Sequence, residues 1–317
     1  MEIVPIAEES LGVRSMAIFV KTKDLGILLD PGISLSPRRF GLPPHPRELE
    51  RVRALRRVLE RYAESATHVL ISHYHRDHFT VPYASIYMGT TGDSYRLIYG
   101  GKQLLMKSPS DINWSQKRRY YGLLKAVEGI VRGIVYVDGN KLSIGDTELL
   151  VSPSLPHGLQ GSRTGRVIAV TISEGSYRFT FMPDVEGPVS QEAMDYLLQV
   201  RPQFLVVGGP PLYLNRGEFN EDYMRLAMKN LVSLIRAGFL ERLVIAHHAL
   251  RELNWRERMR EVFMTAREAH VEVTTYAGLL NREDELLEAR RRELYSAEPP
   301  PRDYLEQFRS VRDEGED

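Results

Sequence analysis

The stretch Thr67-His68-Val69-Leu70-Ile71-Ser72-His73-Tyr74-His75-Arg76-Asp77-His78 decides how this sequence is interpreted. Its first half is a short apolar run that predicts a buried strand. Its second half places four potential metal ligands, His73, His75, Asp77 and His78, directly after that strand. Imidazole and carboxylate groups suit zinc, iron and manganese. An H-x-H pair in a loop can direct both rings at one metal ion, which leaves Asp77 and His78 to face a second ion.

Isolated histidines elsewhere in the chain have a simpler explanation. A lone histidine is most often a core or surface residue, and we expect His45, His68 and His270 to be residues of this kind. For the cluster after residue 72, the corresponding explanation is a polar loop that happens to be rich in histidine. The close spacing of imidazole and carboxylate ligands favours metal-site chemistry instead.

Four other segments place an imidazole or a carboxylate after a predicted strand. They are Leu28-Leu29-Asp30-Pro31-Gly32, Ser154-Leu155-Pro156-His157-Gly158, Phe181-Met182-Pro183-Asp184 and Val244-Ile245-Ala246-His247-His248. An aspartate in such a place is usually a helix cap or a turn residue. Ligands at several strand ends nevertheless fit the rule that α/β sites gather at one edge of a sheet. The chain has no cysteine, so a metal must be held by His, Asp or Glu.

Apolar runs that predict strands alternate along the chain with amphipathic stretches that predict helices. The strands cover residues 16–20, 26–29, 68–71, 148–151, 167–172, 177–182, 204–207 and 243–246, and the helices cover residues 47–62, 120–131, 221–236 and 254–269. This alternation predicts a layered α/β architecture. Glu174-Gly175-Ser176 predicts a hairpin turn between two of the strands, so the sheets are expected to be mixed rather than purely parallel.

Composition limits the class of protein. The 317 residues are 43% hydrophobic, and 42 Lys and Arg balance 42 Asp and Glu. A net charge of zero gives no overall attraction to nucleic acid or to an anionic membrane. The N-terminus lacks a signal-peptide pattern, and no apolar run approaches the ~20 residues of a membrane helix. We therefore expect a cytoplasmic protein without a membrane partner; the oligomeric state is not indicated.

Taken together, these motifs resemble those of a known superfamily. The ordered set Asp30, His73-x-His75-x-Asp77-His78, His157, Asp184 and His247/His248 is similar to the five motifs of the metallo-β-lactamase superfamily. The resemblance covers residues 3–277 and is most specific at the second motif. It implies an α/β fold with four αββα layers, in which two mixed sheets pack face to face between helices. Residues 9–15, 41–46 and 208–214 further resemble an archaeal group known only as predicted metal-dependent hydrolases.

The resemblance also implies a role for each motif residue. A first metal ion would be held by His73, His75 and His157, a second by Asp77, His78 and one of His247 or His248, with Asp184 bridging both and Asp30 orienting the ligand loop. His247 is favoured over His248 because it directly follows a strand. The implied cofactors are two divalent ions, with zinc as the first choice and iron or manganese as alternatives.

The function implied is a metal-dependent hydrolase that uses a metal-bridging hydroxide at a dinuclear site. Asp77 or Asp184 would relay the proton, and Asp30 would act through the ligand loop. The substrate is a small molecule carrying an ester, amide or lactone, or a phosphodiester. Substrate contacts are expected from Arg14, Ser15 and Tyr213.

Two other functions compete with this one. A phosphodiesterase or nuclease acting on RNA or DNA is favoured by residues 102–121, where basic residues alternate with Trp114, Tyr120 and Tyr121. The zero net charge opposes it, and an amphipathic helix with its aromatic residues in the core explains the same pattern. An iron-dependent oxidoreductase of the same fold is the other alternative, but intact Asp77 and His78 argue against a mononuclear dioxygenase. The sequence shows no flavodoxin-like extension of the flavodiiron type.

The expected organisation is a metallo-β-lactamase-like domain over residues 1–280 and a charged C-terminal helix and tail over residues 281–317. Within the domain, residues 79–133 form a lid or an insertion, and the glycine-containing part 79–111 is expected to cover the site. In the C-terminal part, residues 281–295 are expected to be helical.

Overall fold

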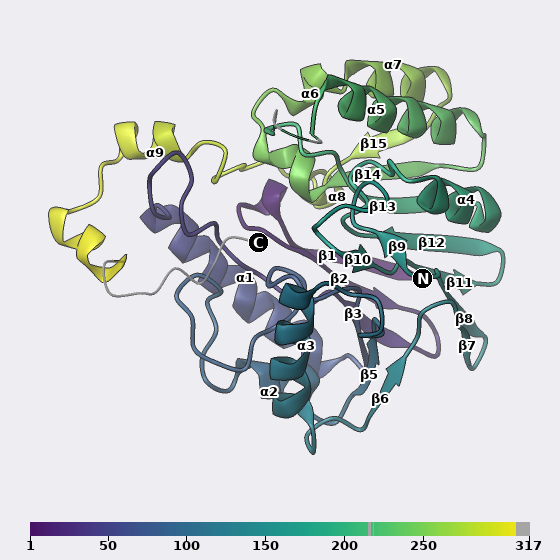
Figure 1. Ribbon diagram of the computed structural model, residues 1–317, viewed down its shortest axis with the longest axis horizontal. Helices are drawn as coiled ribbons and strands as arrows, with labels where there is room; N and C mark the ends of the chain where they lie inside the picture. Colours follow the sequence, from purple (N-terminus) through teal and green to yellow (C-terminus); the bar gives the residue numbers. More distant parts are fainter. Residues whose placement is uncertain (215–216, 218, 309–317) are drawn as a thin grey trace.

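The computed structural model describes residues 1–214, 217 and 219–308, and its centre is a pair of mixed β-sheets (Figure 1). The first sheet has the order β1-β2-β3-β4-β5-β6 and the second has the order β15-β14-β13-β12-β11-β8-β7. The strands of the first sheet are β1 (Glu2–Glu8), β2 (Met16–Lys21), β3 (Gly26–Leu29), β4 (His68–Ile71), β5 (Gln103–Met106) and β6 (Gly133–Tyr136). Those of the second are β7 (Lys141–Ile144), β8 (Thr147–Val151), β11 (Val170–Glu174), β12 (Tyr177–Met182), β13 (Phe204–Gly208), β14 (Arg242–Ala246) and β15 (Glu272–Thr274). A short pair, β9 (Leu155–Pro156) and β10 (Arg166–Val167), lies beside them.

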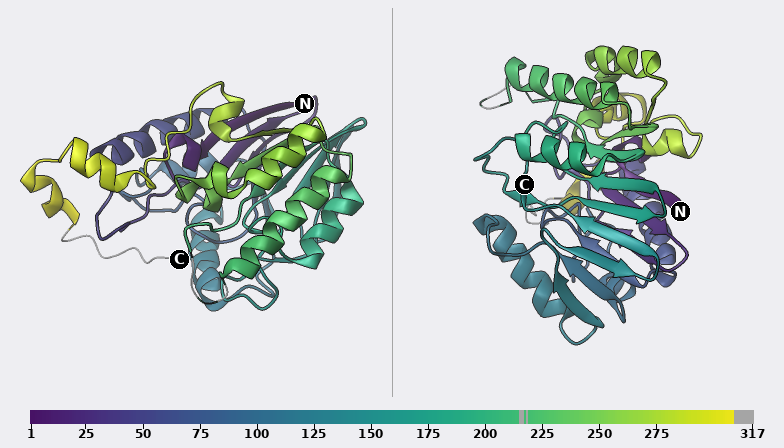
Figure 2. Two further views of the ribbon diagram at one scale, coloured as in Figure 1. Left: turned by 90° about the horizontal axis from the view of Figure 1, so that it is seen from above. Right: turned by 90° about the vertical axis from the view of Figure 1, so that its right-hand side faces the viewer.

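Helices cover the outer faces of both sheets (Figures 1 and 2). On the first sheet these are α1 (Pro46–Glu64), α2 (Ser94–Tyr99) and α3 (Trp114–Val127); on the second they are α4 (Gln191–Val200), α5 (Glu221–Arg236), α6 (Trp255–Arg258) and α7 (Arg260–Glu268). The remaining helices are the short α8 (Tyr276–Leu279), α9 (Arg291–Ala297) and the 3-10 turns η1 (Glu9–Leu11), η2 (His247–Arg251) and η3 (Arg302–Phe308). The predicted four-layer αββα sandwich is therefore confirmed. None of the helices within the described residues has the length and apolar character required to cross a membrane.

Side-chain alternation along the central strands explains why the layers pack. In β13, Phe204 and Val206 belong to the core between the sheets, whereas Leu205 and Val207 pack with the residues of α4 and α5. The neighbouring strand β14 alternates in the same way. Because successive strand residues point to opposite faces, one apolar strand fills two cores at once.

Parallel pairing brings the predicted site residues to one edge. β3 to β6 are parallel in the first sheet, and β12 to β15 are parallel in the second. The carboxyl ends of parallel strands lie at the same edge of a sheet. Asp30 follows β3 and His73 follows β4, while Asp184 follows β12 and His247 follows β14. The strand ends of the two sheets meet at the site described below.

Helix α3 begins earlier than the sequence pattern predicts. The expected start was residue 120, but the helix begins at Trp114, because the Asn113 side chain accepts a hydrogen bond from the Gln116 amide and caps it. The predicted helix over 254–269 is divided into α6 and α7 at Met259. His45 is the N-cap of α1 and forms a capping box with Glu48.

The C-terminal segment packs back onto the sandwich. The expected helix over 281–295 is replaced by an extended path and the shorter α9. Arg291 is fully buried, and its guanidinium donates to both carboxylate oxygens of Glu48 in α1, at 2.8 and 2.7 Å. Glu285 forms an ion pair with Arg51 of α1. The acidic end expected to be a tail, residues 309–317, lies outside the described residues.

Arg291→Ala is expected to lower the free energy of unfolding by about 3–5 kcal/mol, because it leaves the buried Glu48 carboxylate without its cation. Denaturant unfolding of the full chain measures this loss. The matched control is Arg290→Ala, whose side chain is half exposed and, within the described residues, pairs with the exposed Glu293; a change within about 0.5 kcal/mol is expected there. Equal losses in the two variants would contradict this account of the C-terminal segment.

Candidate metal centre

The site lies where loops from both sheets meet, and its backbone is strained. Asp30, Asp184 and His247 have φ values of 44°, 49° and 64°, in the left-handed region that non-glycine residues rarely adopt. Such strain persists only where the surrounding structure holds it, and it gathers at functional sites. Gly208 allows one of these turns, because a Cβ there would lie 2.5 Å from the Asp184 amide nitrogen.

A first group of donor atoms comes from His73, His75, His157 and Asp184, all buried. His73 Nε2 lies 3.0 Å from His75 Nδ1, and the Asp184 Oδ2 atom lies 3.2 Å from His73 Nε2 and 3.1 Å from His157 Nε2. The four donor atoms are within 4.8 Å of one another. This group contains the residues predicted for the first metal ion.

A second group comes from Asp77, His78 and His247, and Asp184 connects it to the first. His247 Nε2 lies 3.4 Å from Asp77 Oδ2 and 3.5 Å from Asp184 Oδ1. His78 Nε2 lies 3.2 Å from Asp184 Oδ2. His248 forms a further group with Asp184 and His247, so both histidines of the doublet face the site. His247, rather than His248, is the one that joins Asp77 and His78.

The chemistry of these donors fits metal ions. His78 Nε2 and Asp184 Oδ1 are buried and accept no hydrogen bond within the described part of the chain. Burial, with His78 as the next cause, holds the pKa of His73 well below its usual value, so its ring is neutral and offers a lone pair. Burial opposes a charge on His78, but Asp184 and Asp30 outweigh burial and raise its pKa well above the usual value. The carboxylates therefore favour a positive charge at this point, which a divalent cation supplies.

Carboxylates lie behind three of the imidazoles that were predicted as ligands. Asp30 accepts hydrogen bonds from the Ser72 amide at 2.7 Å and from His78 Nδ1 at 2.8 Å. The Glu186 carboxylate lies 3.4 Å from His157 Nδ1, and the Glu9 carboxylate lies 3.0 Å from His247 Nδ1. Such partners fix the tautomer and the orientation of a ligand ring. Asp30 was predicted to orient the ligand loop, and it contacts Ser72 and His78 of that loop; Glu9 and Glu186 were not predicted.

Arg251 is a fixed positive charge beside the second group. Its side chain is 5% exposed, and its Nε donates to Glu9 Oε1 at 2.8 Å. One terminal nitrogen lies 3.1 Å from His247 Nε2 and 3.4 Å from Asp77 Oδ2. A positive charge at this separation repels a cation, so the guanidinium opposes metal binding at Asp77 and His247. Within the described residues its side-chain contacts are with Glu9, Tyr213, Asp77 and His247, and none is with the histidines of the first group. No sequence signal distinguishes this arginine from the others.

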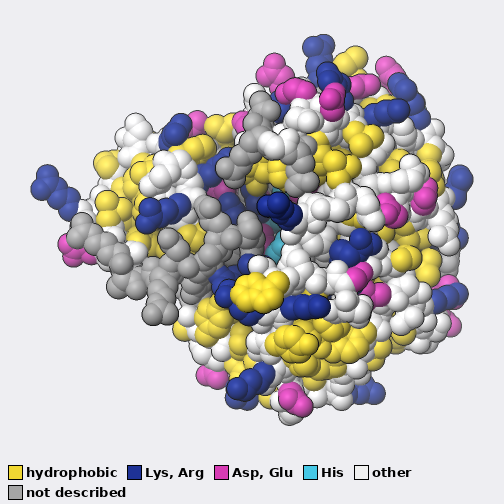
Figure 3. Space-filling view, in the orientation of Figure 1, with side chains coloured by type: hydrophobic (Ala, Val, Ile, Leu, Met, Phe, Trp, Pro, Cys, Tyr) yellow, Lys and Arg dark blue, Asp and Glu magenta, His cyan; other side chains and the backbone are white. Residues whose placement is uncertain are grey.

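A cavity of about 480 Å³ opens above the donor atoms, with His75, Asp77, His157 and Asp184 among its lining residues. Figure 3 looks onto this face, where imidazole groups are visible at the base of a hollow bordered by basic side chains. Arg14 and Tyr213, which were predicted to contact the substrate, line the cavity. Ser15 does not: its buried hydroxyl donates to the Gly32 carbonyl at 2.5 Å, which gives no support for a substrate contact.

The lid expected over residues 79–111 has no support in the structure. This stretch contributes α2 and the internal strand β5, and most of its apolar residues are buried in the core. The wall of the cavity is formed instead by the start of α3, through Asn113, Ser115 and Arg119. The expectation that the aromatic residues of this region face the core holds for Tyr120 only; Trp114 is 72% exposed and Tyr121 is 61% exposed.

Comparisons with known proteins were made for the whole chain. No protein-family model matches it. The UPF0282 protein of Pyrobaculum arsenaticum is 54% identical over 299 residues, covering 94% of this chain and 95% of that protein. The UPF0282 protein of Thermococcus gammatolerans is 40% identical over 299 residues, covering 94% and 96%. Among solved structures, the metallo-β-lactamase fold protein YhfI from Bacillus subtilis is 14% identical with a TM-score of 0.49, covering 86% of this chain and 95% of YhfI.

Arg251→Gln is expected to tighten metal binding at the second group by on the order of tenfold, because a positive charge beside Asp77 and His247 is removed. Titration of metal-depleted protein with Zn²⁺, followed by calorimetry, measures both binding steps. The first step should be nearly unchanged. Arg256→Gln is the control, since Arg256 is half exposed and pairs with Asp284. Weaker binding in Arg251→Gln would show instead that the guanidinium is needed to hold the ligands in place.

Proposed function

The chain belongs to the UPF0282 family, and from this premise and the geometry of its site we propose that it is a metal-dependent hydrolase with a dinuclear centre. One observation carries the proposal: the buried carboxylate of Asp184 contacts both groups of donor atoms, with Oδ2 3.1 Å from His157 Nε2 and Oδ1 3.5 Å from His247 Nε2. A carboxylate shared between two sets of ligands is the arrangement that two neighbouring metal ions require.

In this proposal one ion is held by His73, His75 and His157, the other by Asp77, His78 and His247, and Asp184 contributes to both. Divalent ions supply Lewis acidity and make a coordinated water molecule acidic enough to serve as a nucleophile near neutral pH. The ions are zinc in the first place, with iron or manganese suited to the same donors. The chain contains no cysteine, so a thiol nucleophile is not available as an alternative.

The protein's own residues supply orientation and proton handling. Asp77 or Asp184 was expected to relay the proton; both carboxylates lie among cationic or imidazole groups, which favours a role as ligands. His248 lines the cavity, and its Nδ1 accepts no hydrogen bond among the described residues. Because this imidazole lines the cavity, we assign to it the transfer of a proton from the nucleophile or to the leaving group. Glu186 holds His157 and is itself held by the hydroxyl of Tyr223.

Metal content tests the proposal directly. The purified chain is expected to contain close to two divalent ions, and Asp184→Asn is expected to lose most of both, with hydrolysis of its best substrate reduced by at least about 100-fold. Elemental analysis is combined with a panel of nitrophenyl esters, lactones and bis-aryl phosphodiesters. One iron per chain without hydrolysis would favour the oxidoreductase alternative. Wild-type protein that binds no metal after reconstitution would refute the proposal.

The His247 and His248 pair provides a second, sharper test. His247→Gln is expected to remove about one metal ion per chain, because it deletes a ligand of the second group. His248→Gln should retain both ions and reduce kcat by about 10²–10⁴-fold, the range for loss of a general acid or base. Metal content and kcat are measured on the same preparations. Loss of metal from His248→Gln, with metal retained by His247→Gln, would exchange the two roles.

A further inference from the structure

The walls of the cavity are rich in arginine. Six arginines from widely separated parts of the sequence line it: Arg14, Arg38, Arg39, Arg119, Arg163 and Arg251. The acidic lining residues are Asp77, Asp184 and Glu186, and each of these already contacts a histidine of the metal centre. Arginine presents a planar fork of donors that matches the oxygens of phosphate and carboxylate groups. The lining thus favours an anionic ligand above the donor atoms.

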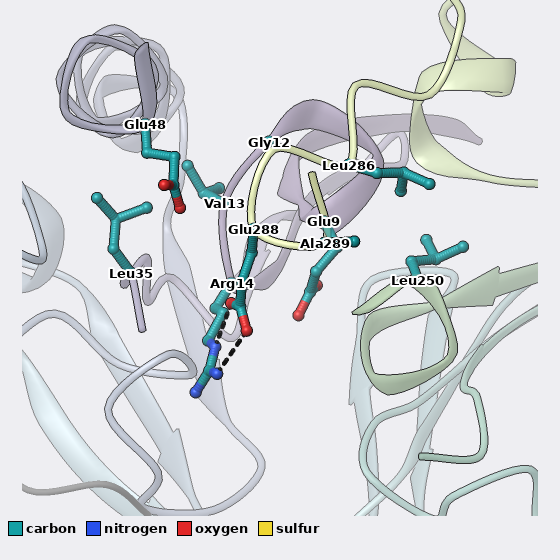
Figure 4. A pocket seen from close by; sticks show the side chains of 10 residues that line it. All are labelled: Glu9, Gly12, Val13, Arg14, Leu35, Glu48, Leu250, Leu286, Glu288 and Ala289. Carbon is teal, nitrogen blue, oxygen red and sulfur yellow. Dashed lines mark hydrogen bonds and ion pairs between the residues drawn. The ribbon is translucent and has the colours of Figure 1, made fainter. Parts of the chain in front are cut away.

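In one wall of the cavity, two guanidinium groups lie beside a single carboxylate. Glu288 of the C-terminal segment accepts two hydrogen bonds from Arg14, at 2.7 and 2.8 Å (Figure 4). The same carboxylate lies 3.8 Å from Arg39 Nε. Arg39 also lies over the Tyr213 ring, 4.6 Å from its centroid, and donates to the Arg251 carbonyl at 3.1 Å. These contacts fix the two cations at the rim and leave one positive charge in excess.

Another part of the lining is formed by the start of α3 and the loop before β10. Asn113 Nδ2 donates to the Arg163 carbonyl at 2.9 Å, and Gln116 Nε2 donates to the Thr164 carbonyl at 3.2 Å. These bonds tie the loop to the helix, and Arg163 and Arg119 both line the cavity there. Arginines from the N-terminal part of the chain and arginines beside α3 therefore line the same cavity as His75 and Asp77.

We propose that the substrate carries an oxyanion, a phosphate or a carboxylate, next to the bond that is cleaved, and that arginines of the two walls bind it. This inference rests on the proposed hydrolase function, because it assigns the substrate class to the same cavity. A fixed guanidinium binds such a group through charge-assisted hydrogen bonds, which neutral esters and lactones lack. The cavity accordingly selects anionic substrates over neutral ones with the same scissile bond.

Binding of three non-hydrolysable probes tests the inference on the metal-loaded full chain. The probes are phenylphosphonate, benzoate and the neutral benzamide, measured by calorimetry. At least one anion should bind, and benzamide should bind at least about tenfold more weakly, as one lost charge-assisted contact implies. A preference for phenylphosphonate identifies a phosphate-bearing substrate, and a preference for benzoate a carboxylate. Benzamide binding as tightly as both anions would overturn the inference.

Metal ions also attract anions, so arginine variants are needed to show how much of the anion binding comes from the cavity walls. Arg39→Gln and Arg163→Gln should each weaken binding of the preferred anion by about tenfold. Arg163 is exposed, so its replacement does not disturb folding. The control is Arg118→Gln, because Arg118 adjoins Arg119 on α3 but lies over the exposed Trp114, 5.4 Å from its ring centroid. Unchanged affinity in both wall variants would refute the inference.

The outcomes of the two proposals are distinguishable. Arginine-dependent anion binding by a chain that hydrolyses nothing on the ester, lactone and phosphodiester panel would leave the anion site standing and refute the hydrolase. Metal-dependent hydrolysis with the same KM in wild type, Arg39→Gln and Arg163→Gln, for an anionic and a neutral nitrophenyl ester alike, would leave the hydrolase standing and refute the anion site.

Discussion

The structure depends on one buried carboxylate oxygen, Asp184 Oδ2, which lies within 3.2 Å of nitrogen atoms from His73, His78 and His157. The first two histidines come from the loop after β4 in the first sheet, and the third comes from the second sheet's side of the sandwich. Satisfying this one atom therefore requires the two sheets to pack in a single relative position. A buried charge left without partners costs several kcal/mol, so alternative packings of the sheets are strongly disfavoured.

Such a cluster specifies the fold more than it stabilises it. Removing charged and polar groups from water costs about as much as their mutual contacts return. Left-handed backbone at Asp30, Asp184 and His247 adds strain of order 1–3 kcal/mol per residue. The compensating stability comes from the two apolar cores, which β13 and β14 fill from both faces. The site thus lies at the edge of the sheets, where its cost does not interrupt either core.

The sequence predicted the parts of this site that are local and missed those made by tertiary contact. His73, His75, Asp77 and His78 could be found because they are adjacent in one loop, and Asp30, His157, Asp184 and His247 because each follows a recognisable strand. Their roles at a metal remain predictions. Glu9, Glu186 and Arg251 carry no such signal, because the importance of these charged side chains depends on the imidazole beside each of them, and that neighbour is set by tertiary contact. The prediction of a lid over residues 79–111 has no support for a related reason. The glycines of this stretch resemble those of a loop, whereas most of its apolar residues build β5 or pack into the core.

The C-terminal segment shows how far apart the parts of the site lie in the chain. Residues 281–295 of this charged segment were expected to form a helix. In the structure Arg291 inserts between α1 and the preceding loop to reach Glu48, and three residues earlier Glu288 reaches Arg14 and Arg39. The buried pair anchors the segment, and the anchored segment fixes the position of one carboxylate between two arginines. Because that carboxylate neutralises only one of the two charges, it orders the wall without cancelling its attraction for anions. This charged C-terminal segment therefore helps to determine the charge of the cavity wall.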